Sequence, residues 1–397
     1  MHLKIAVVVH GRFHAFDLVR ELIHQGHEVT LFTNYPKYFV EKFGIPRTYV
    51  RSFLLHGFLS RIFHRINKLF YLSILENFFC SLFAVWAANK ICQEQYDLIH
   101  CFSGVSEEVF KSVPSSKSLK VLVRGSSHIR VQNKLLEEEK KRSSISVSIE
   151  KPSAWMTARE EREYQISDIV LVLSTFAKKS FIQQGFDQKK LRLLPLGAEL
   201  SKFRPAEIVI DERCQRILSR QPLRILMVGT LSLRKGAIDF VEIAKTAGSA
   251  FNFQFVGAVT AEASFLFRES SQYIKFIPKM PQLELPLVYG WADVFIFTTV
   301  EDGYAVVLSQ AQAAGLPILA TTNCAAPDIV TENQTGWVLP IRSPEAFLER
   351  LNWCNEHRQE LAQMVRRVYE DFQPRDWADV ASDFTKVVTD TLTRSKK

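Results

Sequence analysis

Two neighbouring cations, Arg234 and Lys235, stand in a short turn between an apolar run and a helical pattern. Backbone N–H groups at the start of a helix lack partners within the helix, and the helix dipole favours an anion there. Gly229, earlier in the turn, would let the backbone approach a ligand closely. The residues therefore predict a diphosphate site, although a plain turn with a solvated Arg-Lys pair has the same pattern.

Two acids and an amide follow a later apolar run, residues 294–297. Glu301 and Asp302 precede Gly303, and Gln310 comes eight residues after Asp302. Doubly wound sheets bind ligands at the carboxyl ends of their strands. Carboxylates there could bind sugar hydroxyls and stabilise an oxocarbenium-like centre, and the Gln310 amide could hydrogen-bond a ribose diol. The two acids could instead cap the following helix, which contributes about 0.5–2 kcal/mol and needs no ligand.

Positioning these motifs requires two consecutive units of alternating strands and helices. Residues 3–9 form an apolar run, residues 16–26 a helical pattern that ends at a glycine, and residues 27–33 a second apolar run. This is the βαβ opening of a doubly wound parallel sheet. The alternation restarts at residues 223–228, and 397 residues exceed the usual size of one core. Further strands are predicted at residues 96–101, 120–124, 168–174, 191–195, 253–256, 274–277, 294–297, 317–321 and 336–339.

The boundary between the units is expected within residues 200–222, a polar stretch interpreted as helix-breaking because it contains Pro205 and Pro222. The sequence thus predicts an α/β protein with two Rossmann-like, doubly wound parallel-sheet domains and a short terminal segment. Their expected bounds are residues 1–205, 206–375 and 376–397.

The excess positive charge belongs to the first half of the chain. Residues 1–200 carry 28 Lys and Arg against 19 Asp and Glu, and residues 201–397 carry 22 against 23, so the net charge of +8 divides into +9 and −1. The sequence contains no basic run with interleaved aromatic residues, so a nucleic-acid partner is not indicated.

The six cysteines form no C-x-x-C pair, and the first apolar run is too short for an export signal. We therefore expect a cytoplasmic chain with reduced thiols and no metal site.

A long helical pattern over residues 58–91 interrupts the alternation. In its first half Arg61, Arg65 and Lys68 lie opposite an apolar face. Its second half is long enough to span a membrane, but a central Glu76 costs about 2–3 kcal/mol there, which disfavours spanning. Two interpretations remain. The segment is either a helix pair packed on the first domain or a basic, aromatic-rich helix on an anionic membrane surface.

Residues 301–330 (EDGYAVVLSQAQAAGLPILATTNCAAPDIV) and the GTLSLRKG turn before them resemble the donor half of family 4 retaining glycosyltransferases, which have the GT-B fold. The resemblance extends over most of the chain. Residues 96–103 and 194–203 match landmarks of the first domain and linker. Residues 371–377 match the start of a terminal helix that crosses back onto the first domain.

The resemblance implies roles for the polar residues. Lys235 and Arg234 would hold the donor diphosphate. Asp302 takes the place of a Glu beside the donor sugar, and Gln310 that of a second Glu, which binds the ribose. Glu301 could take the sugar role instead. The implied donor-binding set is Gly229, Arg234, Lys235, Glu301, Gly303 and Gln310.

Three residues of the first domain complete the implied site. His128 corresponds to the family's histidine near the reacting sugar, which makes it a catalytic candidate together with Asp302; it could also be a loop histidine satisfied by its neighbours. Arg12 and His14 follow the first strand and are the acceptor-side candidates.

The implied reaction moves a sugar, with retention, from a nucleotide-diphosphate donor to a hydroxyl acceptor. The expected acceptor is a glycan or lipid-linked glycan of a cell-surface polysaccharide pathway. No D-x-D motif occurs, which agrees with a donor chemistry that needs no metal cofactor. Because Asp302 and Gln310 replace two Glu, a non-catalytic scaffold of the same fold is the alternative. A nicotinamide dehydrogenase is disfavoured, because the first strand is followed neither by G-x-G-x-x-G nor by an acid about 20 residues later.

Overall fold

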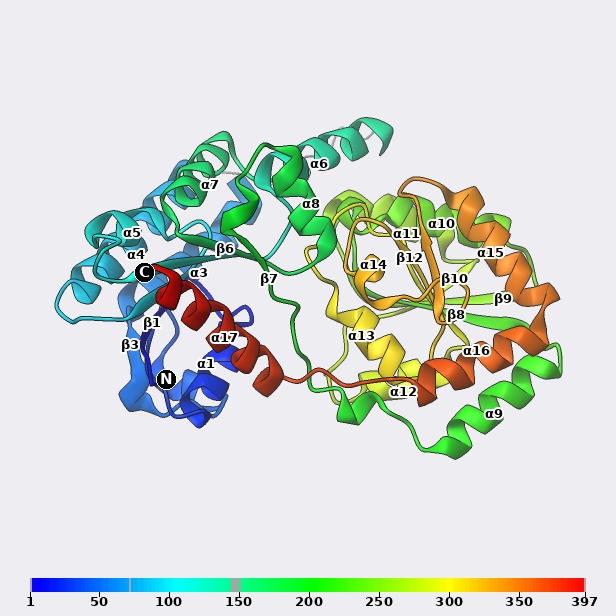
Figure 1. Cartoon of the computed structure of the whole chain (residues 1–397). Helices are drawn as coiled ribbons and strands as arrows, with labels where there is room; N and C mark the ends of the chain where they lie inside the picture. The colour runs from blue at the N-terminus through cyan, green and yellow to red at the C-terminus, as the bar shows by residue number, and fades with distance from the viewer. Residues whose placement is uncertain (1, 71–72, 144–148, 150, 396–397) are drawn as a thin grey trace.

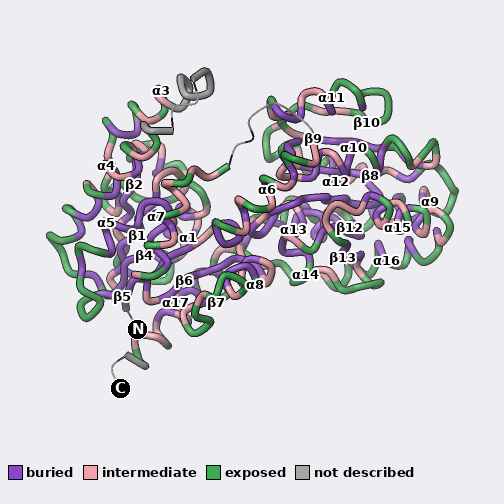
Figure 2. The backbone as a smooth tube through the Cα atoms, turned by 90° about the horizontal axis from the view of Figure 1, so that it is seen from above, coloured by how far each residue is buried: buried purple, intermediate pink, exposed green. Residues whose placement is uncertain are grey.

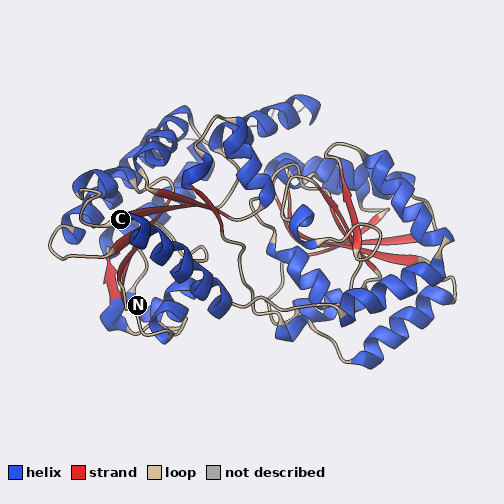
Figure 3. Ribbon diagram, in the orientation of Figure 1, coloured by secondary structure: helices blue, strands red, loops and turns tan. Residues whose placement is uncertain are grey.

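The computed structural model describes residues 2–70, 73–143, 149 and 151–395. Two α/β units lie side by side, each a sheet covered by helices (Figures 1 and 3). The first sheet has the strand order β3-β2-β1-β4-β5-β6-β7 and the second β10-β9-β8-β11-β12-β13, with parallel pairing between neighbours. In each sheet the chain adds strands first toward one edge and then, from the centre, toward the other edge, as in doubly wound folds. The predicted fold class is therefore confirmed.

The first unit contains seven strands and eight α-helices among its described residues. The strands are β1 (Lys4–Val9), β2 (Glu28–Thr33), β3 (Val50–Ser52), β4 (Leu98–Phe102), β5 (Leu119–Arg124), β6 (Ile169–Val172) and β7 (Leu191–Leu193). The helices are α1 (Ala15–His24), α2 (Lys37–Glu41), α3 (Leu54–Phe70), α4 (Ser73–Ile91), α5 (Glu107–Ser112), α6 (Ile129–Ser143), α7 (Ala154–Ile166) and α8 (Thr175–Gln183).

The second unit begins with helix α9 and ends with α16, after which α17 returns to the first unit. Its strands are β8 (Leu223–Leu231), β9 (Phe251–Val259), β10 (Ile274–Ile277), β11 (Val294–Phe297), β12 (Ile318–Thr321) and β13 (Gly336–Leu339). The helices are α9 (Glu207–Leu218), α10 (Ala237–Thr246), α11 (Ser264–Ser270), α12 (Leu285–Trp291), α13 (Val306–Ala313), α14 (Ala326–Ile329), α15 (Pro344–Glu356), α16 (Arg358–Glu370) and α17 (Trp377–Ser395). Short 3-10 turns are η1 (Arg47–Tyr49), η2 (Gln188–Lys190), η3 (Ser201–Phe203), η4 (Leu233–Lys235) and η5 (Ala261–Ala263).

The first sheet is buried on both faces, which explains why β1 reads as a continuous apolar run (Figure 2). Successive side chains of a strand point to opposite faces. Val7 therefore joins the cluster beneath α1 and α17, whereas Val8 joins the cluster beneath α4 and α5. Phe384 of α17 is fully buried in the first of these clusters, so the end of the chain is part of the first unit's core (Figure 1).

Two chain segments join the units and run next to each other. Ala198 N donates a hydrogen bond of 3.0 Å to Arg375 O. A Cβ added at Gly197 would lie 2.3 Å from Asp376 O, so only glycine permits this approach. The predicted domain limits at residues 205 and 375 lie close to these segments and stay predictions.

Two details differ from the sequence-based expectations. The stretch predicted to break helices, residues 200–222, contains the 12-residue helix α9, because Pro205 and Pro222 fall outside its ends. The helical pattern over residues 58–91 is occupied by α3 and α4; the side chains of Arg65 and Lys68 lie outside the described part. Among the described helices, none combines the length and the apolar character needed to cross a membrane.

Candidate active site

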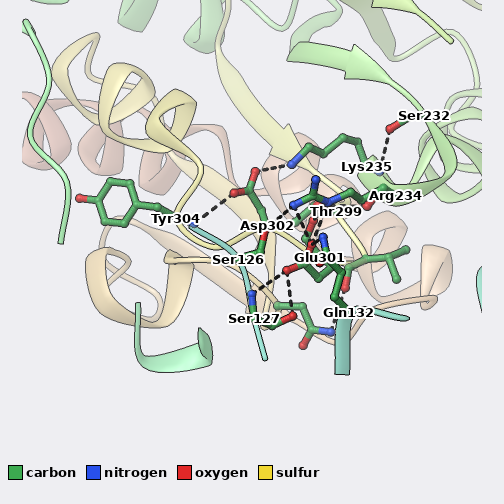
Figure 4. Close-up of polar contacts among 12 residues, drawn as sticks. Ser126, Ser127, Gln132, Ser232, Arg234, Lys235, Thr299, Glu301, Asp302 and Tyr304 are labelled. Atoms are coloured by element: carbon green, nitrogen blue, oxygen red, sulfur yellow. Dashed lines mark hydrogen bonds and ion pairs between the residues drawn. The ribbon is translucent and has the colours of Figure 1, made fainter. Parts of the chain in front are cut away.

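The predicted basic turn and acidic loop meet at the carboxyl ends of β8 and β11, which pair in the second sheet (Figure 4). The carbonyl oxygen of Arg234 accepts hydrogen bonds from Val300 N at 3.0 Å, Glu301 N at 3.3 Å and Thr299 Oγ1 at 3.2 Å. Three bonds to one carbonyl fasten the acidic loop to the basic turn. The two motifs, 67 residues apart in sequence, are therefore one structural element.

A glycine makes this close packing possible. Gly236 has φ +71°, in the left-handed region, and ends η4 where α10 begins. A Cβ added there would lie 1.9 Å from Thr298 O, and Thr298 Oγ1 donates to Gly236 O at 2.9 Å. Any larger residue would push the basic turn away from the acidic loop.

Lys235 and Asp302 form an ion pair between Nζ and Oδ2, with each side chain 19% exposed. Tyr304 N donates to the other carboxylate oxygen of Asp302 at 3.0 Å. Burial alone would raise the pKa of Asp302, but the Lys235 and Arg234 cations outweigh it, so the pKa of this carboxyl lies below its ordinary value. Asp302 is therefore a carboxylate near neutral pH. It lies in partial contact with solvent beside a flexible cation.

Glu301 has a different environment from its neighbour, because its side chain is fully buried between the two units. Oε1 accepts from Ser127 N and Ser127 Oγ, both at 2.9 Å. Oε2 accepts from Arg234 Nε at 2.8 Å and Gln132 Nε2 at 3.4 Å. Because the Glu301 side chain is fully buried whereas that of Asp302 is 19% exposed, the geometry favours Asp302 over Glu301 as the acid beside a donor sugar.

Arg234 is held on two of its three nitrogens. Nε and Nη2 contact Glu301, and Nη2 also donates to Ser126 Oγ at 2.9 Å. Among the described residues Nη1 has no hydrogen-bond partner, and the side chain is 34% exposed. Arg234 thus joins the units and keeps one nitrogen for a ligand (Figure 4).

The acidic loop also docks on the first unit through its next two residues. A Cβ added at Gly303 would lie 2.0 Å from Gly125 O, so the two backbones touch. Tyr304 is 6% exposed and belongs to the apolar cluster of the first unit. The loop that carries Asp302 is therefore positioned by both units.

Gln310 and Gly229 lie at the edges of this arrangement. Gln310 is buried on α13, where its Oε1 accepts a 2.9 Å hydrogen bond from Tyr289, and no contact joins it to Asp302 or Lys235 within the described chain. Gly229 lies inside β8, not in the turn, because this strand continues to Leu231. Its φ of +150° requires glycine, and the space beside it is open.

His128 lies behind the site, packed in an aromatic cluster. Its ring centre is 5.1 Å from that of Tyr164 and 4.9 Å from that of Phe181, and its Nδ1 accepts from Arg130 N at 3.3 Å. Burial is the main cause that lowers the pKa of His128 to about 4. The structure does not bring His128 into contact with Asp302 in the part described. A catalytic role for it remains a prediction from the resemblance alone.

The acceptor-side candidates lie at the start of α1. The His14 ring packs between Phe102 and Trp377, and its centre lies 4.8 Å from that of the Phe102 ring and 6.0 Å from that of the Trp377 ring. Burial lowers the pKa of His14 to about 4. Arg12 is exposed, with its guanidinium 4.0 Å from the centre of the Phe43 ring. His14 therefore supports the returning helix α17, and the acceptor roles of both residues stay predictions.

Sequence reasoning missed the partners of these residues. Ser126, Ser127 and Gln132 contact Glu301 or Arg234 from the other unit, and Tyr289 holds Gln310. The only available signal for the first three was their place after the strand β5. Nothing in their spacing indicates a partner more than 100 residues away.

Comparison with known families agrees with this geometry. The model of the family described as "Glycosyltransferase Family 4" matches residues 12–202, and that of "Glycosyl transferases group 1" matches residues 211–371. The two ranges cover both α/β units and most of the chain. The chain belongs to the family 4 glycosyltransferases.

Curated relatives of this family 4 chain include proteins named for colanic acid and amylovoran biosynthesis. It is 24% identical to the putative colanic acid biosynthesis glycosyltransferase WcaL of Escherichia coli K12. The match extends over 228 residues, or 54% of each chain. The chain is 26% identical over 199 residues to the amylovoran biosynthesis glycosyltransferase AmsK of Erwinia amylovora, 47% of each chain. The chain thus spans about half the length of the curated relatives it matches.

Solved structures share the whole two-unit architecture. Anabaena Alr3699/HepE in complex with UDP superposes with a TM-score of 0.69 at 13% identity, covering 98% of this chain and 100% of that one. Sucrose-phosphate synthase from Thermosynechococcus elongatus gives a TM-score of 0.65 at 16% identity, covering 98% and 99%. The fold of the family 4 chain is therefore GT-B.

The buried contacts of Glu301 lead to a testable expectation for this family 4 chain. Glu301→Gln is expected to lower the free energy of unfolding by about 1–3 kcal/mol, because Arg234 loses its anionic partner between the units. Each kcal/mol corresponds to about 2–4 °C in the thermal midpoint of a domain of this size. Glu349→Gln, at a side chain 70% exposed, is the matched control. Equal midpoints for the two variants would show that the contact does not stabilise the protein.

Proposed function

We propose that this chain transfers a sugar from a nucleoside-diphosphate donor to a hydroxyl acceptor, with retention of anomeric configuration. The observation that carries the proposal is the Lys235–Asp302 pair, partly exposed at the carboxyl ends of β8 and β11 beside the other unit. An ammonium and a carboxylate next to each other there provide one group for a diphosphate and one for sugar hydroxyls.

Each polar group then has a defined task. Lys235 and Nη1 of Arg234 would stabilise the negative charge of the leaving diphosphate, a role for which we propose no divalent metal ion. Asp302 would accept hydrogen bonds from the donor sugar, and Gln310 would reach the ribose after rearranging its contact with Tyr289. Fixed groups of this kind stabilise charge as it develops on the leaving group.

The relatives support the class of donor and acceptor. Two carry names that place them in colanic acid and amylovoran synthesis, and structural neighbours are described in complex with UDP and with UDP-glucose. We propose by analogy a sugar nucleotide as donor and a glycan or lipid-linked glycan of a polysaccharide pathway as acceptor. A non-catalytic scaffold is the competing function, because Asp302 and Gln310 stand where the family has two Glu.

A panel of sugar nucleotides tests the donor assignment. A donor at 100 times its dissociation constant should raise the free energy of unfolding by about 2.7 kcal/mol, because it binds only the folded protein. We expect one or a few sugar nucleotides to raise the unfolding temperature and the free sugars to leave it unchanged. A panel in which no sugar nucleotide shifts the unfolding temperature would remove the donor assignment.

We further propose that α3 lies on an anionic membrane surface. Its outward face carries a stripe of exposed apolar side chains, hereafter the α3 stripe: Leu54, Leu55, Phe58, Leu59 and Ile62, each 41–65% exposed. By contrast α4 contributes Phe83 and its neighbours to the core. Arg61 is not free on an opposite face, because its guanidinium lies 4.5 Å from the centre of the Tyr35 ring. The stripe and the +9 charge of residues 1–200 support adsorption to lipid.

Binding to lipid vesicles should depend on the basic residues of α3. The protein is expected to sediment with anionic vesicles at low salt and to be released by high salt, because each basic residue near the leaflet contributes about 1 kcal/mol. The variant Arg61→Glu/Arg65→Glu/Lys68→Glu should bind at least about tenfold more weakly. The control carries three reversals on the second unit, at Lys245, Arg268 and Lys279, all exposed. Binding to neutral and anionic vesicles alike would return α3 to a purely structural role.

A further inference from the structure

The second sheet has a groove at the edge opposite the candidate active site. It lies where β8, β9 and β10, which are neighbours in the sheet, begin (Figure 1). β8 is nine residues long, so at about 3.3 Å per residue the groove lies roughly 30 Å from the donor loops. Its volume is about 790 Å³, within the range of about 300–1,000 Å³ for small-ligand sites. A ligand in this groove could not be the donor bound at Lys235.

The groove is basic, although the second half of the chain has a slight net negative charge. Arg224, Lys245 and Lys275 line it, and no Asp or Glu does, although Glu269 lies 3.5 Å from the Lys245 ammonium. The nearby Asp293 is in contact with Arg216 and with the backbone of Arg224. Burial is the main cause that lowers the pKa of Arg224, and repulsion from Arg216 adds to it. A bound anion would relieve that repulsion.

Aromatic rings and amides complete the lining. Tyr273 is 42% exposed at the groove, and the Trp291 ring lies 5.6 Å from the Arg224 guanidinium. Asn252 and Gln272 add amide groups that both donate and accept hydrogen bonds. Aromatic faces suit the apolar faces of pyranose rings, amides suit their hydroxyls, and fixed cations suit carboxylates.

We propose that this groove is a non-catalytic binding site for an acidic oligosaccharide. Single-stranded nucleic acid also combines phosphates with stacked bases, but it needs a basic groove that follows its backbone over several nucleotides. The three cations here line one half-open groove at the start of three neighbouring strands, together with the amides of Asn252 and Gln272, and do not form a track along a strand of nucleic acid. Because the site is remote from Lys235 and Asp302, its failure would leave the proposed transfer reaction untouched.

Binding of defined glycans to the intact chain tests the proposal. Calorimetry would compare a hyaluronan tetrasaccharide, which is acidic, with maltotetraose, which is neutral, and with a short oligothymidylate. We expect saturable binding of the acidic glycan, and at least tenfold weaker binding by Lys275→Glu and by Tyr273→Ala. Both side chains are exposed, so these changes should not disturb folding, which equal unfolding midpoints would verify.

The matched control lies just past the other end of β10. Lys279→Glu carries an identical charge reversal four residues beyond Lys275, past the carboxyl end of β10, and should bind the acidic glycan like the wild type. Equal losses in Lys275→Glu and Lys279→Glu would show a diffuse charge effect and overturn the site. Absence of saturable binding, equal affinity for the neutral glycan, or tighter binding of the oligothymidylate would overturn it as well.

Discussion

Asp302→Asn is expected to lower the rate of sugar transfer at least about a hundredfold while nucleoside diphosphate still binds. Asp302 is the only carboxylate that the described site leaves partly exposed beside Lys235, because Glu301 is enclosed by Ser127, Gln132 and Arg234. Removing one fixed group that stabilises transition-state charge costs about 10²–10³ in rate. Initial rates of donor consumption, with diphosphate affinity from calorimetry, would measure both effects.

The variant Glu301→Gln is the internal comparison for that result. Its buried carboxylate contacts only protein donors, so its loss should affect stability more than the rate at saturating donor. If Glu301→Gln were inactive and Asp302→Asn active, the acid beside the donor sugar would be Glu301, one residue before the one assigned.

Lys235→Ala is expected to weaken nucleoside-diphosphate binding by about 1.5–3 kcal/mol, or roughly 10- to 150-fold. This is the range for hydrogen bonds to charged groups, and the Lys235 side chain is 19% exposed where the two loops pair. Part of the loss would come from Asp302, whose negative charge would then face the diphosphate without a compensating cation. Calorimetric titration with the diphosphate gives the affinity directly.

Two further variants make the Lys235 result specific. Lys279→Ala removes an exposed lysine of the same unit and should leave the affinity unchanged. Arg234→Ala should weaken binding too, through Nη1, and should also lower stability through Glu301. Unchanged affinity in both Lys235→Ala and Arg234→Ala would eliminate the diphosphate assignment.

Much of the fold was predictable because buried parallel strands have a plain signature. Residues 274–277, 294–297 and 336–339 are strands with the predicted limits. Residues 294–297 are a continuous buried apolar run. Residues 274–277 form an edge strand, in which the exposed Lys275 interrupts the apolar residues. The three-residue edge strand Val50–Ser52 was missed, because Arg51 and Ser52 leave no apolar run to mark it.

The limits of sequence reasoning are clearest where contacts are remote. Pro205 and Pro222 made residues 200–222 look helix-breaking, yet prolines flanking a segment leave room for α9 between them. The outward direction of the α3 stripe depends on the packing of Gly57 against Asn34, where an added Cβ would lie 2.0 Å from Asn34 O. No local pattern contains that information.

In the candidate site too, some features follow from local sequence and others depend on remote contacts. The pairing of Lys235 with an acid was predictable in kind, because both motifs end neighbouring strands of one sheet. Which of two adjacent acids faces solvent was not, because it depends on Ser127 and Gln132 in the other unit. Similarly, His128 is at the expected place in sequence, but Tyr164 and Phe181 enclose its ring.

The most direct test of the proposed function is donor consumption followed in real time by ³¹P NMR. The intact chain would be mixed with the sugar nucleotide that most raises its unfolding temperature, with and without a glycan acceptor. The proposal predicts that nucleoside diphosphate accumulates with the wild type, faster when acceptor is present, and at least about a hundredfold more slowly with Asp302→Asn. A donor that binds but is never consumed, or is consumed equally fast by Asp302→Asn, would contradict a transferase centred on Asp302 and Lys235.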